Sequence, residues 1–152
     1  MKTLASLILI TGLLATTLPA SGSRDRDSKQ EIQKQFIGAW KLASLEEPDA
    51  SGTIHKADCT GMLVFTADGK ASVQVMYQNA ESASAYAQGG YEASYGSYKI
   101  DGASTMTFHI DGSLVRTLIG KYLERKYEIS GNRLTITSTN QNEHWRVVWE
   151  RF

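Results

Sequence analysis

The sequence predicts an all-β fold, an eight-stranded antiparallel up-and-down β-barrel with a short N-terminal helix. After Gly38, apolar and polar residues alternate with a period of two along most of the chain, which is the pattern of strands with one buried face. Tight-turn pairs such as Asp68-Gly69 and Asp101-Gly102 separate the apolar runs, and such pairs favour hairpins. No amphipathic helix remains in the sequence to cover an open sheet, so closure into a barrel is expected to remove the exposed edges.

The first 22 residues have the features of a secretory signal peptide. Lys2 precedes an apolar run over residues 4–18, and small residues follow. This order of basic start, apolar stretch and small-residue exit is typical of exported proteins, and cleavage after Ala20 or Gly22 fits equally. We therefore expect a periplasmic or extracellular protein. An uncleaved anchor is the alternative, although the run is shorter than the roughly 20 residues of a membrane span.

The mature chain is expected to be one domain of 130 residues with 15 basic and 16 acidic side chains. Such a chain can bury a sufficient core without disulfides. Cys59 is the single cysteine, so we interpret it as an incidental thiol, with pairing between chains or reactivity as alternatives. The near-neutral charge does not favour nucleic acid as a partner. We expect no membrane segment after cleavage, and a monomer or weak homodimer.

Residues 23–35 are predicted to be a polar linker that leads into the short helix. Ser28 and Glu31 have the spacing of a capping box at a helix start. One or two helical turns over about residues 29–36 are expected to plug one end of the core. The barrel domain is predicted to span residues 36–152.

Eight strands are expected in this domain, and most are joined by short turns. They are predicted at residues 39–44, 62–65, 71–77, 91–100, 104–111, 118–129, 133–139 and 144–152. Residues 48–60 are rich in turn-forming side chains and are predicted to be a long loop. Residues 78–90 carry little apolar mass besides Tyr86, which favours a mobile loop or a short helix over the barrel rim.

The alternation along residues 118–129 places an arginine on the inward face. Leu123 and Tyr127 belong to the apolar face, and Arg125 lies between them. An arginine cannot lose its charge and must find acceptors, so Arg125 is a candidate anchor for a carboxylate, phenolate or carbonyl of a ligand. A structural ion pair at the rim, or an outward orientation, is the alternative. His109 is ambiguous: hydrophobicity places it outside, whereas an inward His109 would titrate near neutral pH inside the barrel.

Several short motifs occur in a recognisable order over residues 36–139. They are Gly38-Ala-Trp-Lys-Leu, Gly61-Met-Leu-Val-Phe-Thr-Ala-Asp-Gly-Lys, Tyr95-Gly-Ser-Tyr98, Thr107-Phe-His-Ile, Gly120-Lys-Tyr-Leu-Glu-Arg125 and Gly131-Asn-Arg-Leu-Thr-Ile. Together they resemble the lipocalin-like domain family of bacteria and fungi. The resemblance implies a small barrel with a central cavity, in a family whose members mostly have no assigned ligand or reaction. A few related domains are thought to guide isomerisation or cyclisation in secondary-metabolite pathways.

Carried over residue by residue, the resemblance implies that Tyr95, His109 and Arg125 occupy positions where the family places Tyr, His and Arg. Phe108 stands where a second His is often found, so chemistry that needs a pair of histidines is not supported. In the wider lipocalins, a late arginine covers the Gly-x-Trp indole by a cation–π contact. Arg151 is favoured over Arg146 for this role, because alternation places Arg151 on the face of the last tryptophans.

The sequence lacks the usual signatures of hydrolases and metal sites. It contains no Gly-x-Ser-x-Gly motif, and His55, Cys59, His109 and His144 do not have the spacing of zinc ligands. We therefore predict no catalytic residues, no metal and no cofactor.

The favoured hypothesis is non-covalent binding of a small, largely apolar ligand of unknown identity in the barrel. The residues predicted at the cavity are Trp40, Tyr95, His109, Arg125 and Trp149, and Trp40 under Arg151 is predicted to close one end. One alternative is a cofactor-independent isomerase or cyclase in the same cavity, with an inward His109. Another is a structural or interaction domain of the cell envelope that uses its rim loops.

Overall fold

The computed structural model describes residues 21–81 and 84–152. The predicted signal peptide therefore lies outside the described residues, apart from Ser21 and Gly22. The elements are α1 (Ser21–Phe36), β1 (Gly38–Pro48), β2 (Ile54–Lys56), β3 (Cys59–Phe65), β4 (Lys70–Tyr77), β5 (Tyr91–Ile100), β6 (Thr105–Ser113), the 3₁₀ turn η1 (Arg116–Leu118), β7 (Tyr122–Ser130), β8 (Arg133–Ser138) and β9 (Arg146–Arg151). No helix among the described residues is long and apolar enough to cross a membrane.

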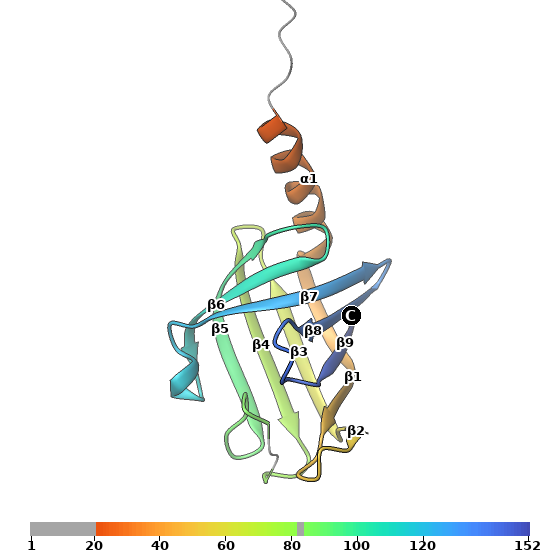
Figure 1. Ribbon diagram of the computed structural model, residues 1–152, viewed down its shortest axis with the longest axis vertical. Helices are drawn as coiled ribbons and strands as arrows, with labels where there is room; N and C mark the ends of the chain where they lie inside the picture. The colour runs from red at the N-terminus through yellow and green to blue at the C-terminus, as the bar shows by residue number, and fades with distance from the viewer. Residues whose placement is uncertain (1–20, 82–83) are drawn as a thin grey trace, which may run out of the picture.

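Eight of the strands form a closed antiparallel barrel, which confirms the predicted fold class (Figure 1). Neighbours in sequence pair from β3 to β9, and β1 closes the sheet by pairing with both β3 and β9. At the closure, Trp40 lies opposite Arg151 and Leu42 lies opposite Trp149. Closure leaves no long edge strand in the barrel, which is the physical advantage expected from the sequence.

Several element boundaries differ from the predicted ones. Residues 48–60 are not one loop, because β2 pairs with the end of β1 and β3 begins at Cys59. The strand predicted over residues 118–129 begins only at Tyr122. The residues before it form η1 and a tight turn, in which Gly120 has a positive φ of 80° and donates its N–H to the carbonyl of Ile110.

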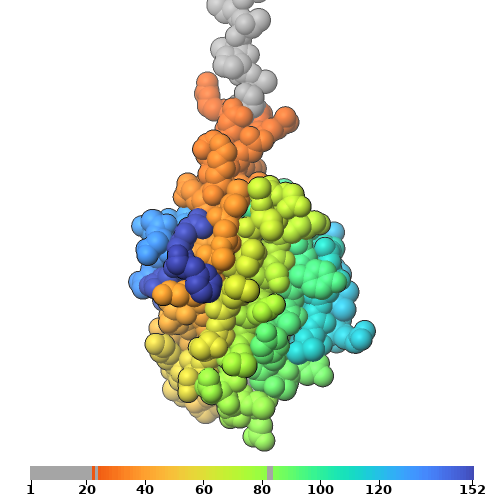
Figure 2. Space-filling view, turned by 180° about the vertical axis from the view of Figure 1, so that it is seen from behind, coloured from red at the N-terminus to blue at the C-terminus, as the bar shows by residue number. Residues whose placement is uncertain are grey.

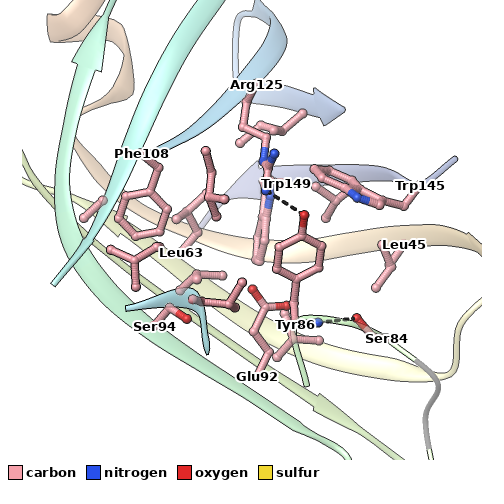
Figure 3. Close-up of a pocket in the computed structure, with 18 of the residues that line it drawn as sticks. Leu45, Leu63, Ser84, Tyr86, Glu92, Ser94, Phe108, Arg125, Trp145 and Trp149 are labelled. Atoms are coloured by element: carbon pink, nitrogen blue, oxygen red, sulfur yellow. Dashed lines mark hydrogen bonds between the residues drawn. The ribbon is translucent and has the colours of Figure 1, made fainter. Parts of the chain in front are cut away.

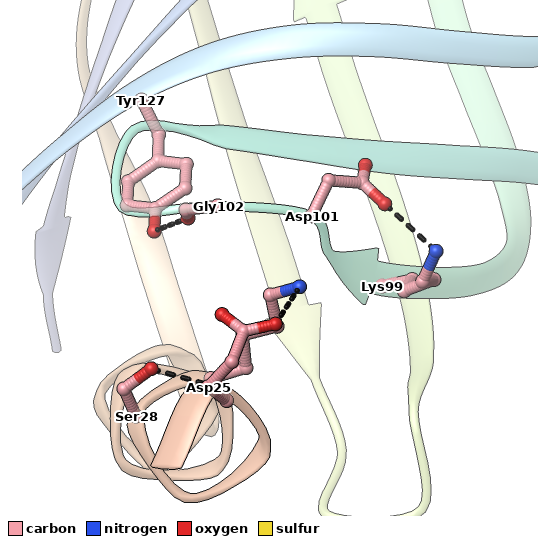
Figure 4. Close-up of polar contacts among 7 residues, drawn as sticks. Asp25, Ser28, Lys99, Asp101, Gly102 and Tyr127 are labelled. Atoms are coloured by element: carbon pink, nitrogen blue, oxygen red, sulfur yellow. Dashed lines mark hydrogen bonds and ion pairs between the residues drawn. The ribbon is translucent and has the colours of Figure 1, made fainter. Parts of the chain in front are cut away.

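Helix α1 is longer than predicted and stands on one end of the barrel (Figures 1 and 2). The predicted linker is helical, and Lys29 pairs with Asp25 across one turn at 2.9 Å. Ser28 lies inside the helix and donates to the carbonyl of Asp25 at 2.8 Å, so the predicted capping box is wrong (Figure 4). Pairs three and four residues apart stabilise an exposed helix locally, so a polar segment can be helical without an apolar face.

The end of α1 plugs the barrel, as predicted. Phe36 is fully buried, and its ring centroid lies 5.2 Å from that of Phe65 and 4.9 Å from that of Tyr127. The hydroxyl of Tyr127 donates to the carbonyl of Gly102 at 2.8 Å, next to the Lys99–Asp101 ion pair (Figure 4). Aromatic packing and a hydrogen-bonded tyrosine hydroxyl therefore close this end of the barrel.

Trp40 and Arg151 fasten the C-terminus to the same end. The guanidinium of Arg151 lies 4.1 Å from the centre of the Trp40 ring, which is the predicted cation–π contact. Arg151 also donates to the carbonyls of Gln35 and Ile37, and Figure 2 shows the C-terminal residues beside the base of α1. Gly38 is required here, because it has a φ of 127° and a Cβ would come within 2.7 Å of Arg151 Nη1.

Candidate functional site

A cavity of about 120 Å³ lies inside the barrel, away from the end that Phe36 and Trp40 close. All eight barrel strands contribute to its wall, which is mainly apolar. Leu63, Phe108 and Trp149 are among the apolar wall residues, and Glu92 and Arg125 reach the same space (Figure 3). Its volume is comparable to the roughly 150 Å³ of an engineered apolar cavity that holds benzene, so it has room for a molecule of about one ring.

Arg125 reaches the cavity from β7, on the inward face that alternation predicted. Its guanidinium donates to the hydroxyl of Tyr86 at 2.9 Å and to the carbonyl of Glu124 at 2.9 Å. It also lies 5.3 Å from the ring centre of Tyr86 and 5.0 Å from that of Trp145. The charge of Arg125 is therefore held between protein groups on one side of the cavity.

Glu143 completes this cluster from the turn before β9. Its carboxylate accepts hydrogen bonds from the Tyr86 hydroxyl at 2.8 Å and from the Trp145 indole at 3.1 Å. Burial opposes ionisation, yet hydrogen bonds from Ser138, Tyr86 and Trp145 hold the pKa of Glu143 below its usual range. The result is an ionised acid that fixes the Tyr86 side chain against Arg125.

Glu92 is the second acid of the site. It is the second residue of β5, is half-buried, and lines the cavity. No hydrogen bond or ion pair joins its carboxylate to another residue of the described ranges 21–81 and 84–152. Burial raises the pKa of Glu92 to about 7, Arg125 opposes this rise, and Glu47 adds to it.

Glu47 and Tyr77 form a separate pair at the cavity wall. The Tyr77 hydroxyl donates to the Glu47 carboxylate at 3.2 Å. Burial raises the pKa of Glu47, against the opposing effects of this hydrogen bond and of His55. Burial also raises the pKa of Tyr77. Tyr77 therefore stays a neutral donor, and Glu47, unlike Glu92, already has a protein partner.

The structure places two of the five predicted cavity residues on the cavity wall. Arg125 and Trp149 line the cavity. Trp40 is fully buried beneath Arg151 and does not line it. That Arg125 and Trp149 contact a ligand remains a prediction.

Tyr95 and His109 lie on the outer surface, so their predicted cavity positions are wrong. Tyr95 is 61 % exposed, and its ring covers Gly112, where a Cβ would collide with it. His109 pairs with Asp111 at 2.9 Å, and its ring centroid lies 4.4 Å from that of Tyr122. In both strands the residues of the opposite parity are the buried ones. The hydrophobicity that placed His109 outside was therefore correct, and the inward positions that the family resemblance implied for Tyr95 and His109 were not.

Sequence reasoning missed Glu92, Tyr86 and Glu143. The parity of β5 offered a signal for Glu92, because Ser94, Tyr98 and Ile100 share its face and are buried. Tyr86 and Glu143 lie in segments without periodicity, which give no comparable signal. Cys59 is also half-buried, and burial raises the pKa of its thiol to about 11, so the thiolate required for reactivity is disfavoured.

Comparison with known families identifies the barrel. The family model described as "Lipocalin-like domain" matches residues 37–152. The chain belongs to the lipocalin-like domain family. This lipocalin-like domain is also similar to two solved structures from Bacteroides, and it has no significant match among curated proteins.

The first structure is a lipocalin-like protein from Bacteroides uniformis, with 18% identity, a TM-score of 0.49, and coverage of 78% of this chain and 99% of that chain. The second is an uncharacterized protein from Bacteroides eggerthii, with 16% identity, a TM-score of 0.48, and coverage of 77% of this chain and 99% of that chain.

Proposed function

We propose that this lipocalin-like domain binds a small, largely apolar ligand non-covalently inside the barrel. The observation that carries the proposal is the cavity of about 120 Å³, whose wall combines apolar side chains with the inward-facing Arg125 and Glu92. Binding sites of this kind are concave and mostly apolar, with a few polar groups that fix orientation. Because the cavity is below the roughly 300–1,000 Å³ of sites for drug-sized molecules, the expected ligand is about the size of one ring.

The isomerase alternative in its predicted form is not compatible with the geometry. It required His109 inside the cavity as the titratable group, and His109 lies outside, paired with Asp111. The proposal of a binding protein does not depend on His109. It depends only on space in the barrel and on an apolar wall.

The binding proposal is tested by titrating the protein with toluene and following amide shifts by NMR. Val75→Phe fills the cavity from β4, where Val75 is 3 % exposed and lines the wall. Met62→Phe makes the same kind of change on the outer surface, where Met62 is 38 % exposed. Toluene should shift cavity residues in the wild type and in Met62→Phe, and should bind at least tenfold more weakly to Val75→Phe. Equal binding to all three proteins would overturn the cavity as the site.

We further propose that the protein is exported after removal of its N-terminal segment. The support is the order of basic, apolar and small residues over residues 1–22. N-terminal sequencing of protein recovered from the periplasm or medium should begin at Ser21 or Ser23. Recovery of the intact N-terminus in the cytoplasmic fraction would contradict export.

A further inference from the structure

We propose that the cavity selects a small apolar amine, held as its ammonium ion by the Glu92 carboxylate. This inference rests on the proposed function, because it names the chemical class that the same cavity prefers. It stands on a contrast between the three charged side chains that line the cavity. Two of them are already engaged by protein groups, whereas Glu92 has no hydrogen-bond or ion-pair partner among residues 21–81 and 84–152.

Arg125 and Glu47 are the two engaged charges. The guanidinium of Arg125 donates to Tyr86 and to the Glu124 carbonyl, and it stacks on Trp145. The carboxylate of Glu47 accepts the Tyr77 hydroxyl. A ligand that bound either group would have to compete with these contacts, whereas a ligand that binds Glu92 competes with no hydrogen bond or ion pair from the described part of the chain.

The chemistry of Glu92 favours a cation over other donors. An ionised carboxylate in an apolar cavity is destabilised unless it is paired. An ammonium group provides both a compensating charge and charge-assisted hydrogen bonds, which are about twice as strong as neutral ones. A carboxylate ligand would instead meet Glu47 and Glu92 together, against a single guanidinium that is already in use.

The remainder of the cavity requires an apolar body on that amine. The wall also includes Leu63, Phe108 and Trp149, and the volume of about 120 Å³ accommodates roughly one ring. A free metal ion or a strongly hydrated cation would leave these surfaces uncovered. A single-ring primary amine such as benzylamine has both parts in one molecule, so it is the probe of choice.

The protonation of Glu92 gives the inference a pH signature. Glu92 is faced by Glu47 from β1, Tyr77 from β4, Arg125 from β7 and Tyr86 from the loop before β5. With a pKa of about 7 in the free protein, Glu92 is mostly neutral at pH 5.5 and mostly ionised at pH 8. Only the ionised form pairs with an ammonium ion, so benzylamine should bind about 30-fold more weakly at pH 5.5 than at pH 8.

The test compares benzylamine with ethylbenzene, which has the same number of non-hydrogen atoms and no charge. Dissociation constants are measured by NMR titration and calorimetry at pH 5.5 and 8, for the wild type, Glu92→Gln and Glu124→Gln. Glu124 is exposed on the outer face of β7 and serves as the matched control. At pH 8 the wild type and Glu124→Gln should bind benzylamine at least tenfold more tightly than ethylbenzene. Glu92→Gln should lose this preference and the pH dependence, and should keep its affinity for ethylbenzene.

Each outcome decides between the two proposals. If ethylbenzene binds and benzylamine binds no more tightly, the selection of amines is wrong and the binding cavity stands. If the preference for benzylamine survives in Glu92→Gln, Glu92 is not the anchor and the inference is overturned. If neither compound binds the wild type, the proposed function fails together with the inference. Should Glu92→Gln fold poorly, a wild-type affinity for benzylamine that does not change between pH 5.5 and 8 overturns the inference equally.

Discussion

Two buried tryptophans differ in the partner of the indole N–H, and the same substitution should therefore affect them differently. Trp40 is 0% exposed, and its Nε1 donates to the carbonyl of Phe36 at 2.8 Å. Trp149 is 2% exposed, and its Nε1 has no hydrogen-bond partner among the described residues. Replacement by Phe removes the same atoms at both sites. The packing losses are therefore similar, and the comparison isolates the hydrogen bond.

The expected difference follows from these contacts. Trp40→Phe leaves the carbonyl of Phe36 without its donor, which costs about 1–2 kcal/mol, and it weakens the cation–π contact with Arg151 by about 0.5 kcal/mol. Trp149→Phe removes an unpaired donor, whose desolvation penalty of about 1–3 kcal/mol is recovered. Trp40→Phe should therefore lower the free energy of unfolding by about 2.5–5.5 kcal/mol more than Trp149→Phe does.

Urea unfolding of the two variants and the wild type, followed by circular dichroism and by the fluorescence of the remaining tryptophans, measures this difference. The slopes of the unfolding transitions should agree among the three proteins, so that the midpoints report stability alone. Costs that agree within about 0.5 kcal/mol, or a larger cost for Trp149→Phe, would contradict this expectation. Either result would mean that packing, rather than hydrogen bonding, decides the contribution of these two side chains.

Three further predictions concern the closed end of the barrel and the cavity acid. Gly38→Ala should destabilise the fold by about 2–4 kcal/mol, because Gly38 has a φ of 127° and lies against Arg151. The control Gly131→Ala, in open space with a φ of 58°, should cost about 1 kcal/mol. Equal shifts of the thermal midpoint in the two variants would contradict this prediction. Arg151→Ala should lower the free energy of unfolding by about 2–4 kcal/mol and speed amide hydrogen exchange at the end of α1. The control Arg133→Ala removes an exposed ion pair and should lower the free energy of unfolding by less than about 1 kcal/mol. Unchanged amide exchange in Arg151→Ala would contradict the role of Arg151 in holding the C-terminus at this end. Because the folded pKa of Glu92, about 7, exceeds its ordinary 4.5, its protonated form adds stability that is present at pH 4 and is lost as the pH rises through 7. The free energy of unfolding of Glu92→Gln should therefore exceed that of the wild type by up to about 3 kcal/mol at pH 8 and match it near pH 4. Urea unfolding from pH 4 to 8 measures this difference, and a difference that stays constant over that range would exclude the linkage.

Local patterns were sufficient for the barrel because strand parity is a property of neighbouring residues. Alternation in the last strand favoured Arg151 over Arg146 for the contact with Trp40 that the family resemblance implied, and alternation around Leu123 placed Arg125 inside. The length of α1 was missed, because its outer turns are held by exposed pairs such as Asp25–Lys29 rather than by an apolar face. Those pairs contribute only a few tenths of a kcal/mol each, so polarity alone could not distinguish a helix from a linker.

Local alternation and turn residues were enough to predict the eight strands, the closed end under Phe36 and the inward orientation of Arg125. The same alternation places Glu92 inside, although no local pattern shows that this acid lacks a partner among the described residues. The contacts of Tyr86 and Glu143 with the Arg125 cluster depend on the folded chain, because these two residues come from segments without periodicity. The electrostatic state of Glu92 depends on what eight strands from distant parts of the chain bring around it. The free energy of a buried charge is set by that whole surrounding volume, and a linear pattern does not encode it.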